Sequence, residues 1–91
     1  MELELNNYME ELVIEYMEDM LKDRDDVCKC ERCLQDIATF ALNKLPPKYF
    51  SGHKGKVYSR LEEFENQIRV DIISILGRAI EMVNKDPHHE E

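Results

Sequence analysis

The longest helical pattern in the chain occupies residues 59–85, SRLEEFENQIRVDIISILGRAIEMVNK. Its apolar residues recur at intervals of three and four, which is the spacing of one face of an α-helix. The members of this stripe are Leu61, Phe64, Ile68, Ile72, Ile75, Ala79 and Met82. Ser59 followed by Glu62 is typical of a capping box, so the pattern predicts a helix that begins at Ser59. At about 1.5 Å per residue, such a helix is about 40 Å long.

The length of this helix predicts that the protein is a homodimer. The chain has only 91 residues, and two shorter helices in one protomer are too few to cover the whole apolar stripe. A second copy of the chain is the simplest cover, since the stripe approximates a heptad pattern. Gly77 lies inside the helix, where glycine costs about 1 kcal/mol relative to alanine. We expect its missing side chain to allow a close approach between helices.

Two shorter helices precede the long one, and no segment has a pattern typical of a strand. The first is predicted over about residues 7–22, where Asn7 and Glu10 fit a capping pair. The second is predicted over about residues 33–44. It ends before the two prolines at 46 and 47, because proline removes a backbone donor and disfavours helix at the preceding residue.

The composition describes one small acidic domain. The chain carries 12 lysines and arginines against 20 aspartates and glutamates, a net charge of −8. This charge disfavours binding to nucleic-acid polymers and to anionic membranes. A secretory leader and an apolar run of about 20 residues are both missing, so we expect a cytoplasmic protein without a membrane span. We therefore expect a single all-α domain over residues 1–91, frayed at residues 1–6 and 87–91.

A cluster of three cysteines lies in the segment VCKCERCLQD, residues 27–36. Cys30 and Cys33 form a C-x-x-C pair and Cys28 adds a third sulfur, which suits a tetrahedral zinc ion with thiolate ligands. A reducing compartment and an odd number of cysteines disfavour a disulfide. We interpret the cluster as a structural zinc site that staples the start of the second helix. The alternatives are a thiol redox switch, plain packing and a catalytic nucleophile, which lacks an identifiable base here.

The fourth zinc ligand is left open by the sequence, because three thiolates fill only three tetrahedral positions. His88 and His89 are candidates if the C-terminal tail folds back towards the cysteines. His53, water or a partner protein can also fill the position. The chain has no pair of carboxylates and no cysteine–histidine pair in a catalytic context, so we do not expect an enzyme.

A basic segment interrupts the acidic chain. Between Ile37 and Leu61 there is no aspartate or glutamate but there are five lysines and arginines, which leaves seven basic and 20 acidic residues elsewhere. Interleaved aromatic residues suit an anion that also carries flat rings. The candidate binding residues are Lys48, Tyr49, Lys54, Lys56, Tyr58 and Arg60. The alternative is a solvated loop whose lysines complement the acidic helices, with Tyr49 and Phe50 anchored on the core.

The cysteine cluster and the basic segment together form VCKCERCLQDIATFALNKLPPKY, residues 27–49. Its block ALNKLPPKY, the later KGKVYS and NQI, and the DP at 86–87 complete a pattern over nearly the whole chain. This pattern resembles the late competence development protein ComFB family. The resemblance implies a small all-helical homodimer in the bacterial cytosol, with zinc on the cysteine cluster. It also implies a receptor for a cyclic dinucleotide, c-di-GMP or c-di-AMP, that signals to a downstream protein.

The family pattern marks Pro47, Tyr49 and Gln67, so Gln67 joins the candidate nucleotide-binding residues. Some members lack the cysteines, which implies a structural metal, and a fourth cysteine near the C-terminus is missing from this chain. The pattern does not choose between the two dinucleotides and does not name the downstream protein. The alternative function is a competence-associated adaptor without a small ligand, whose basic segment binds an acidic protein surface.

Overall fold

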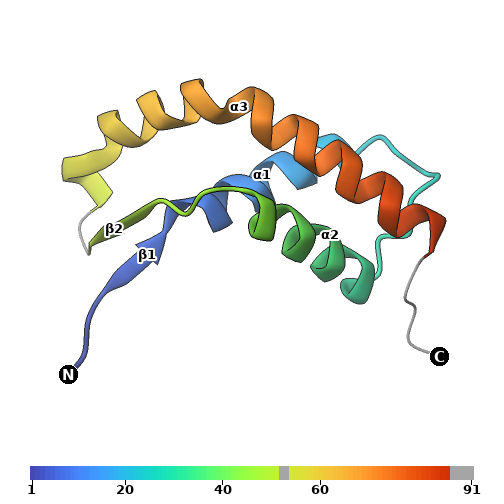
Figure 1. The fold of residues 1–91 in the computed structure, drawn as a ribbon, viewed down its shortest axis with the longest axis horizontal. Coiled ribbons are helices and arrows are strands. Elements are labelled where there is room, and N and C mark those ends of the chain that lie inside the picture. The colour runs from blue at the N-terminus through green and yellow to red at the C-terminus, as the bar shows by residue number, and fades with distance from the viewer. Residues whose placement is uncertain (52–53, 87–91) are drawn as a thin grey trace.

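The computed structural model describes residues 1–51 and 54–86, and it describes only the backbone of residues 54–59. The elements along the chain are β1 (Leu5–Asn7), α1 (Tyr8–Leu21), α2 (Glu31–Lys44), β2 (Tyr49–Ser51) and α3 (Lys54–Lys85). The three helices pack against one another, and α3 runs along one edge of the molecule (Figure 1). The predicted three-helix domain is confirmed, with a small two-stranded sheet added to it.

The two short strands were not predicted. They pair antiparallel, with Leu5 opposite Ser51 and Asn7 opposite Tyr49. Three residues are too few for the alternation of apolar and polar side chains that reveals a strand in a sequence. Leu5 and Asn6, which belong to the segment 1–6 that we expected to be frayed, lie in β1.

Phe50 anchors β2 on the core. Its side chain is buried, and its ring meets the ring of Tyr8 edge-on, with the centroids 6.2 Å apart and the planes at 74°. Edge-to-face contacts of this kind add to the stabilisation that burial provides. Of the two aromatic residues that we considered as loop anchors, Phe50 fits that role, whereas Tyr49 is exposed.

Asn7 joins the beginning of α1 to the segment that follows α2. Its Oδ1 atom accepts a hydrogen bond from the backbone N–H of Met9 at 3.2 Å, which confirms the predicted helix cap. The same atom accepts a second bond from the backbone N–H of Lys48 at 2.9 Å. The N–H of Tyr8 in turn donates to the carbonyl of Lys48. These bonds fix where the chain after the two prolines meets α1.

The apolar stripe of α3 is covered mainly within its own protomer. Four of the seven predicted members are buried, namely Leu61, Ile68, Ile72 and Ala79. Leu76 and Ile80 are also buried, whereas Met82 is 54% exposed. A straight helix has 3.6 residues per turn, so its buried face drifts away from a strict heptad spacing along 32 residues. The predicted stripe therefore does not itself require a second copy.

Two predicted helix starts are wrong. α3 begins at Lys54, five residues before the predicted cap at Ser59. A serine followed three residues later by a glutamate also fits the interior of a helix, so the motif alone does not fix the start. α2 begins at Glu31, two residues before the predicted start at Cys33. None of the helices in the described part of the chain is long and apolar enough to cross a membrane.

Replacing Asn7 with alanine is expected to lower the free energy of unfolding by about 1–2 kcal/mol, because a helix cap is lost and a second backbone donor loses its partner. The measurement is urea denaturation at constant metal loading. Asn6→Ala is the matched control, since Asn6 is the exposed neighbour in the same strand. Its effect should stay within about 0.5 kcal/mol. Equal losses in the two variants would contradict this role of Asn7.

Candidate metal centre and basic surface

The three cysteines converge as the sequence predicts. The Sγ atoms of Cys28, Cys30 and Cys33 lie within 4.8 Å of one another. Sulfur ligands of a tetrahedral zinc ion, each about 2.3 Å from the metal, are about 3.8 Å apart. Small rotations about the side-chain bonds close this difference. The cluster can therefore hold a metal ion through three sulfur atoms.

The first turn of α2 explains why the sulfur atoms converge. Cys30 is the N-cap of α2, and its Sγ accepts a hydrogen bond from the backbone N–H of Cys33 at 3.4 Å. Its carbonyl accepts a bond from the N–H of Leu34 at 3.0 Å. Backbone N–H groups and the positive end of the helix dipole favour negative charge at this position. The helix start thus suits a thiolate at Cys30.

Burial distinguishes the three thiols. Cys33 is completely buried, whereas Cys28 and Cys30 are half-buried. Burial, followed by hydrogen bonds with Cys30 and Cys28, raises the pKa of the Cys33 thiol to about 12. A protonated buried thiol is a poor nucleophile, which weighs against Cys33 in the nucleophile alternative. A divalent cation would supply the positive charge that stabilises three thiolates in this place.

The loop before the cluster is ordered by a local ion pair. Arg24 donates two hydrogen bonds to Asp26, from Nε to Oδ1 at 3.1 Å and from Nη2 to Oδ2 at 2.6 Å. The bond from Arg24 is the main cause that lowers the pKa of Asp26. Both side chains face solvent, so the pair contributes little to overall stability.

The end of α3 lies beside the first turns of α2. A groove of about 520 Å³ separates them, lined by Asp36, Thr39, Phe40, Met82, Val83, Lys85 and Asp86. Figure 1 shows the end of α3 on the same side of the molecule as the loop into α2. Asp36 follows Cys33 by three residues, which is less than one helical turn. The candidate ligands His88 and His89 come two and three residues after Asp86 and lie outside the described residues, as does His53.

The basic segment meets α3 at the other end of α2. Lys48 is half-buried, and its Nζ atom lies 5.3 Å from the centroid of the Phe64 ring. Arg60 and Gln67 are exposed on α3, seven residues apart and therefore on the same face as each other. Tyr49, next to Lys48, is 63% exposed. The structure thus brings Lys48 against α3, the helix that also carries Arg60 and Gln67.

The remaining candidate nucleotide-binding residues, Lys54, Lys56 and Tyr58, have side chains outside the described part of the chain. Phe64 was predicted only as a member of the apolar stripe. It is half-buried, and its ring face receives the Lys48 ammonium, a contact that is favourable because of the quadrupole of the ring. No local pattern links position 48 to position 64, so sequence reasoning missed this contact.

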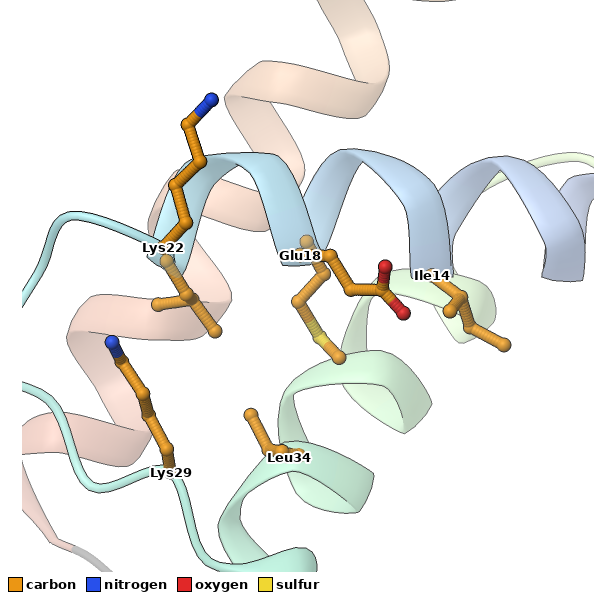
Figure 2. A pocket seen from close by; sticks show the side chains of 7 residues that line it. Ile14, Glu18, Lys22, Lys29 and Leu34 are labelled. Atoms are coloured by element: carbon orange, nitrogen blue, oxygen red, sulfur yellow. The ribbon is translucent and has the colours of Figure 1, made fainter.

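A second groove, of about 370 Å³, lies between α1 and α2. Its lining residues are Ile14, Met17, Glu18, Leu21, Lys22, Lys29 and Leu34. Figure 2 shows Lys22 and Lys29 at one end of the groove and Glu18 with Ile14 at the other. Lys29 stands between two of the clustered cysteines in the sequence. Ile14, an exposed apolar residue of α1, is a feature of this groove for which the sequence analysis gave no role. None of the candidate nucleotide-binding residues lines it.

Comparison with known proteins identifies the family. The sequence matches the family described as late competence development protein ComFB over residues 6–87. The chain belongs to the ComFB family. It is 28% identical over 79 residues to the competence protein ComFB of Bacillus subtilis (strain 168), which covers 87% of this chain and 76% of that protein. The solved structure of the late competence protein ComFB from Bacillus subtilis superimposes with a TM-score of 0.70 at 27% identity and covers 92% of each chain.

The ComFB match includes both features of the candidate site. Residues 6–87 contain the cysteine cluster, the basic segment and all of α3. The resemblance based on residues 27–49 is therefore confirmed, and so is the association of the family with competence. The sequence match and the similarity of fold agree over nearly the same length of chain.

Replacing Cys28 with serine is expected to abolish tight binding of one Zn²⁺ equivalent, because a hydroxyl is a much poorer zinc ligand than a thiolate. Cys28 is only half-buried, so its substitution leaves the core intact. Bound zinc is measured by native mass spectrometry and the Tm by circular dichroism, with and without chelator. Chelator should lower the Tm of the wild type and leave the Tm of Cys28→Ser unchanged. Equal responses would show that Cys28 is not a ligand.

Proposed function

We propose that this ComFB-family protein is a homodimeric receptor for a cyclic dinucleotide, c-di-GMP or c-di-AMP, with a structural zinc ion on its cysteine cluster. The observation that carries the proposal is the contact between Lys48 and Phe64. It gathers basic and aromatic residues of the segment after α2 beside the α3 face that carries Arg60 and Gln67. The protein acts by binding and not by catalysis.

The chemistry of a cyclic dinucleotide matches these residues. Each ligand has two phosphates and two bases joined in a ring, and a guanidinium binds phosphate oxygens through paired hydrogen bonds. Arg60 supplies the guanidinium, and the exposed ring of Tyr49 supplies a surface on which a base can stack. A two-fold symmetric ligand also suits a two-fold symmetric pair of protomers.

The distribution of charge supports a small ligand over a polymer. The whole chain carries a net charge of −8, which repels a long polyanion at distances comparable to the Debye length. A small anion needs only the local positive charge of the segment between Ile37 and Leu61, which contains no acidic residue. We therefore expect binding without affinity for DNA or for membranes.

The zinc ion has a structural role in this proposal. The cysteine cluster is at the beginning of α2 and the basic segment follows its end, so 14 residues of helix separate them, about 20 Å. Figure 1 shows these two places on opposite sides of the molecule. The metal ties the loop after α1 to the first turn of α2. In a chain of this size, a bound metal ion adds stability that the small hydrophobic core alone does not provide.

Arg60→Ala is expected to weaken binding of the preferred dinucleotide at least about 10-fold, because a hydrogen bond to a charged group contributes about 1.5–3 kcal/mol. The measurement is isothermal titration of the metal-loaded protein with c-di-GMP and then with c-di-AMP. Arg69→Ala is the matched control, since Arg69 is exposed on the same helix and bonds Asn66 within that helix. Its affinity should equal that of the wild type.

Unchanged affinity in Arg60→Ala would move the ligand to another surface. An absence of heat with both dinucleotides, together with an unshifted Tm at excess ligand, would overturn the receptor function. The adaptor alternative would then take its place. The groove between α1 and α2 favours that alternative, because apolar side chains of Ile14, Met17 and Leu34 line it together with charged ones. A mixed lining of this kind is common at surfaces that bind other proteins.

His88 and His89 are the proposed source of the fourth zinc ligand, because the end of α3 lies beside the first turns of α2. We expect the double variant His88→Ala/His89→Ala to bind zinc at least about 10-fold more weakly, since one of four ligands is lost. His53→Ala is the control, as the remaining histidine of the chain. Competition with a chromophoric chelator measures the affinity. The absorption spectrum of the Co²⁺-loaded protein separately reports whether a nitrogen ligand is lost. Identical spectra and affinities would exclude the tail as the ligand source.

A further inference from the structure

The cysteine cluster has two thiols that solvent can reach and one that the core encloses. Cys28 and Cys30 are half-buried, whereas Cys33 is completely buried. All three are thiols in this structure. A small oxidant that arrives from solvent therefore meets Cys28 or Cys30 before it meets Cys33. Accessibility of this kind decides which cysteine of a cluster is oxidised first.

Cys30 and Cys33 are placed as the two halves of a disulfide. Cys30 is the N-cap of α2 and Cys33 lies in its first turn, where residues three apart have Cα atoms about 5 Å from each other. Most disulfides join Cα atoms about 4.4–6.8 Å apart. The backbone N–H of Cys33 already donates to the Sγ of Cys30 at 3.4 Å, and the two Sγ atoms lie within 4.8 Å. Rotation of the two side chains is therefore enough to bring the sulfur atoms together.

Cys28 is a less suitable partner for either of these sulfur atoms. Only Lys29 separates it from Cys30, and a disulfide across a single residue departs from the preferred torsion about the S–S bond. Cys28 also belongs to the loop before α2, so helical geometry does not hold its Cα atom near that of Cys33. The first turn of α2 thus favours the pair of Cys30 and Cys33 and leaves Cys28 as the third thiol.

We propose that hydrogen peroxide converts Cys30 and Cys33 to a disulfide, so that the cysteine cluster is a reversible oxidation site. The Cys30 thiolate first attacks peroxide: an S–O bond forms, the O–O bond breaks and hydroxide leaves. The Cys33 sulfur then attacks the resulting sulfenic acid: an S–S bond forms, the S–O bond breaks and a second hydroxide leaves. Each hydroxide takes up a proton to give water, and two electrons pass from the sulfur atoms to peroxide.

This reaction removes two of the three sulfur ligands that the cluster can offer to a metal ion. A disulfide sulfur lacks the negative charge of the thiolate that binds zinc. The loop between α1 and α2, which contains Cys28, would then lose its tie to the first turn of α2. In a reducing compartment, disulfides are typically transient and serve catalysis or redox sensing. The reaction does not depend on dinucleotide binding, because the basic segment follows the other end of α2.

Trypsin makes the pairing of the cysteines directly measurable. It cleaves after Lys29 and Arg32, so the three cysteines fall into the separate peptides 25–29, 30–32 and 33–44. The metal-loaded protein is treated with hydrogen peroxide, alkylated with iodoacetamide and digested without reductant. Mass spectrometry should find peptide 30–32 joined to peptide 33–44, with Cys28 alkylated in peptide 25–29. A chromophoric chelator should detect zinc release in step with the disulfide, and dithiothreitol with added zinc should reverse both changes.

Two serine variants separate the proposed pair from the third thiol. Cys28→Ser should form the same disulfide, because both sulfur atoms of the pair remain. Cys30→Ser is the matched variant, since Cys30 is also half-buried, and its yield of intramolecular disulfide should fall at least about 10-fold. Circular dichroism checks that both variants are folded.

Four results would overturn the proposal. They are a predominant bond to peptide 25–29, a disulfide between two copies on a non-reducing gel, zinc release without a disulfide, and three intact thiols after treatment. The wild-type peptide map decides among them even if a serine variant does not fold. None of these results affects the titrations with c-di-GMP and c-di-AMP, which test the receptor function separately.

Discussion

Two hydrogen bonds to the Oδ1 atom of Asn7, from the backbone of Met9 and of Lys48, connect the beginning of α1 to the chain that follows α2. The bond from Met9 caps α1. The bond from Lys48 holds the segment that follows the two prolines at 46 and 47. β1 and β2 pair immediately beside them. With the backbone of Lys48 fixed in this way, its side chain extends over Phe64. The arrangement of the basic surface therefore depends on the contacts between the Lys48 backbone and the beginning of α1, in which the Asn7 amide takes part.

The small sheet and the cysteine cluster lie at opposite ends of α2. At its beginning, the N-cap position brings Cys30 and Cys33 together, and Cys28 approaches from the loop. At its end, buried Leu45 and Phe50 bring the chain back onto the core. Small domains have little buried surface to offset the loss of conformational entropy. Contacts at both ends of α2 therefore help to stabilise a domain of this size.

α3 has two faces with different roles. One is buried against the protomer through Leu61, Ile72 and Leu76. The other exposes Val70 and carries the open position at Gly77. Because the helix is 32 residues long, it contributes buried residues to the core and also carries Arg60 and Gln67 on its exposed side. The stripe that we expected to be covered by a second copy is largely buried within the protomer.

The sequence by itself determined three helices, the cap at Asn7, four of the seven predicted core positions of α3 and the convergence of the three cysteines. Each of these follows from residues a few positions apart, where helical geometry alone decides which side chains are neighbours. The family, too, was recognisable from one segment, residues 27–49. Only the tertiary structure decided the strand pairing, the start of α3 at Lys54 and the contact of Lys48 with Phe64. Contacts between distant segments depend on how the whole chain packs, and no local spacing encodes them.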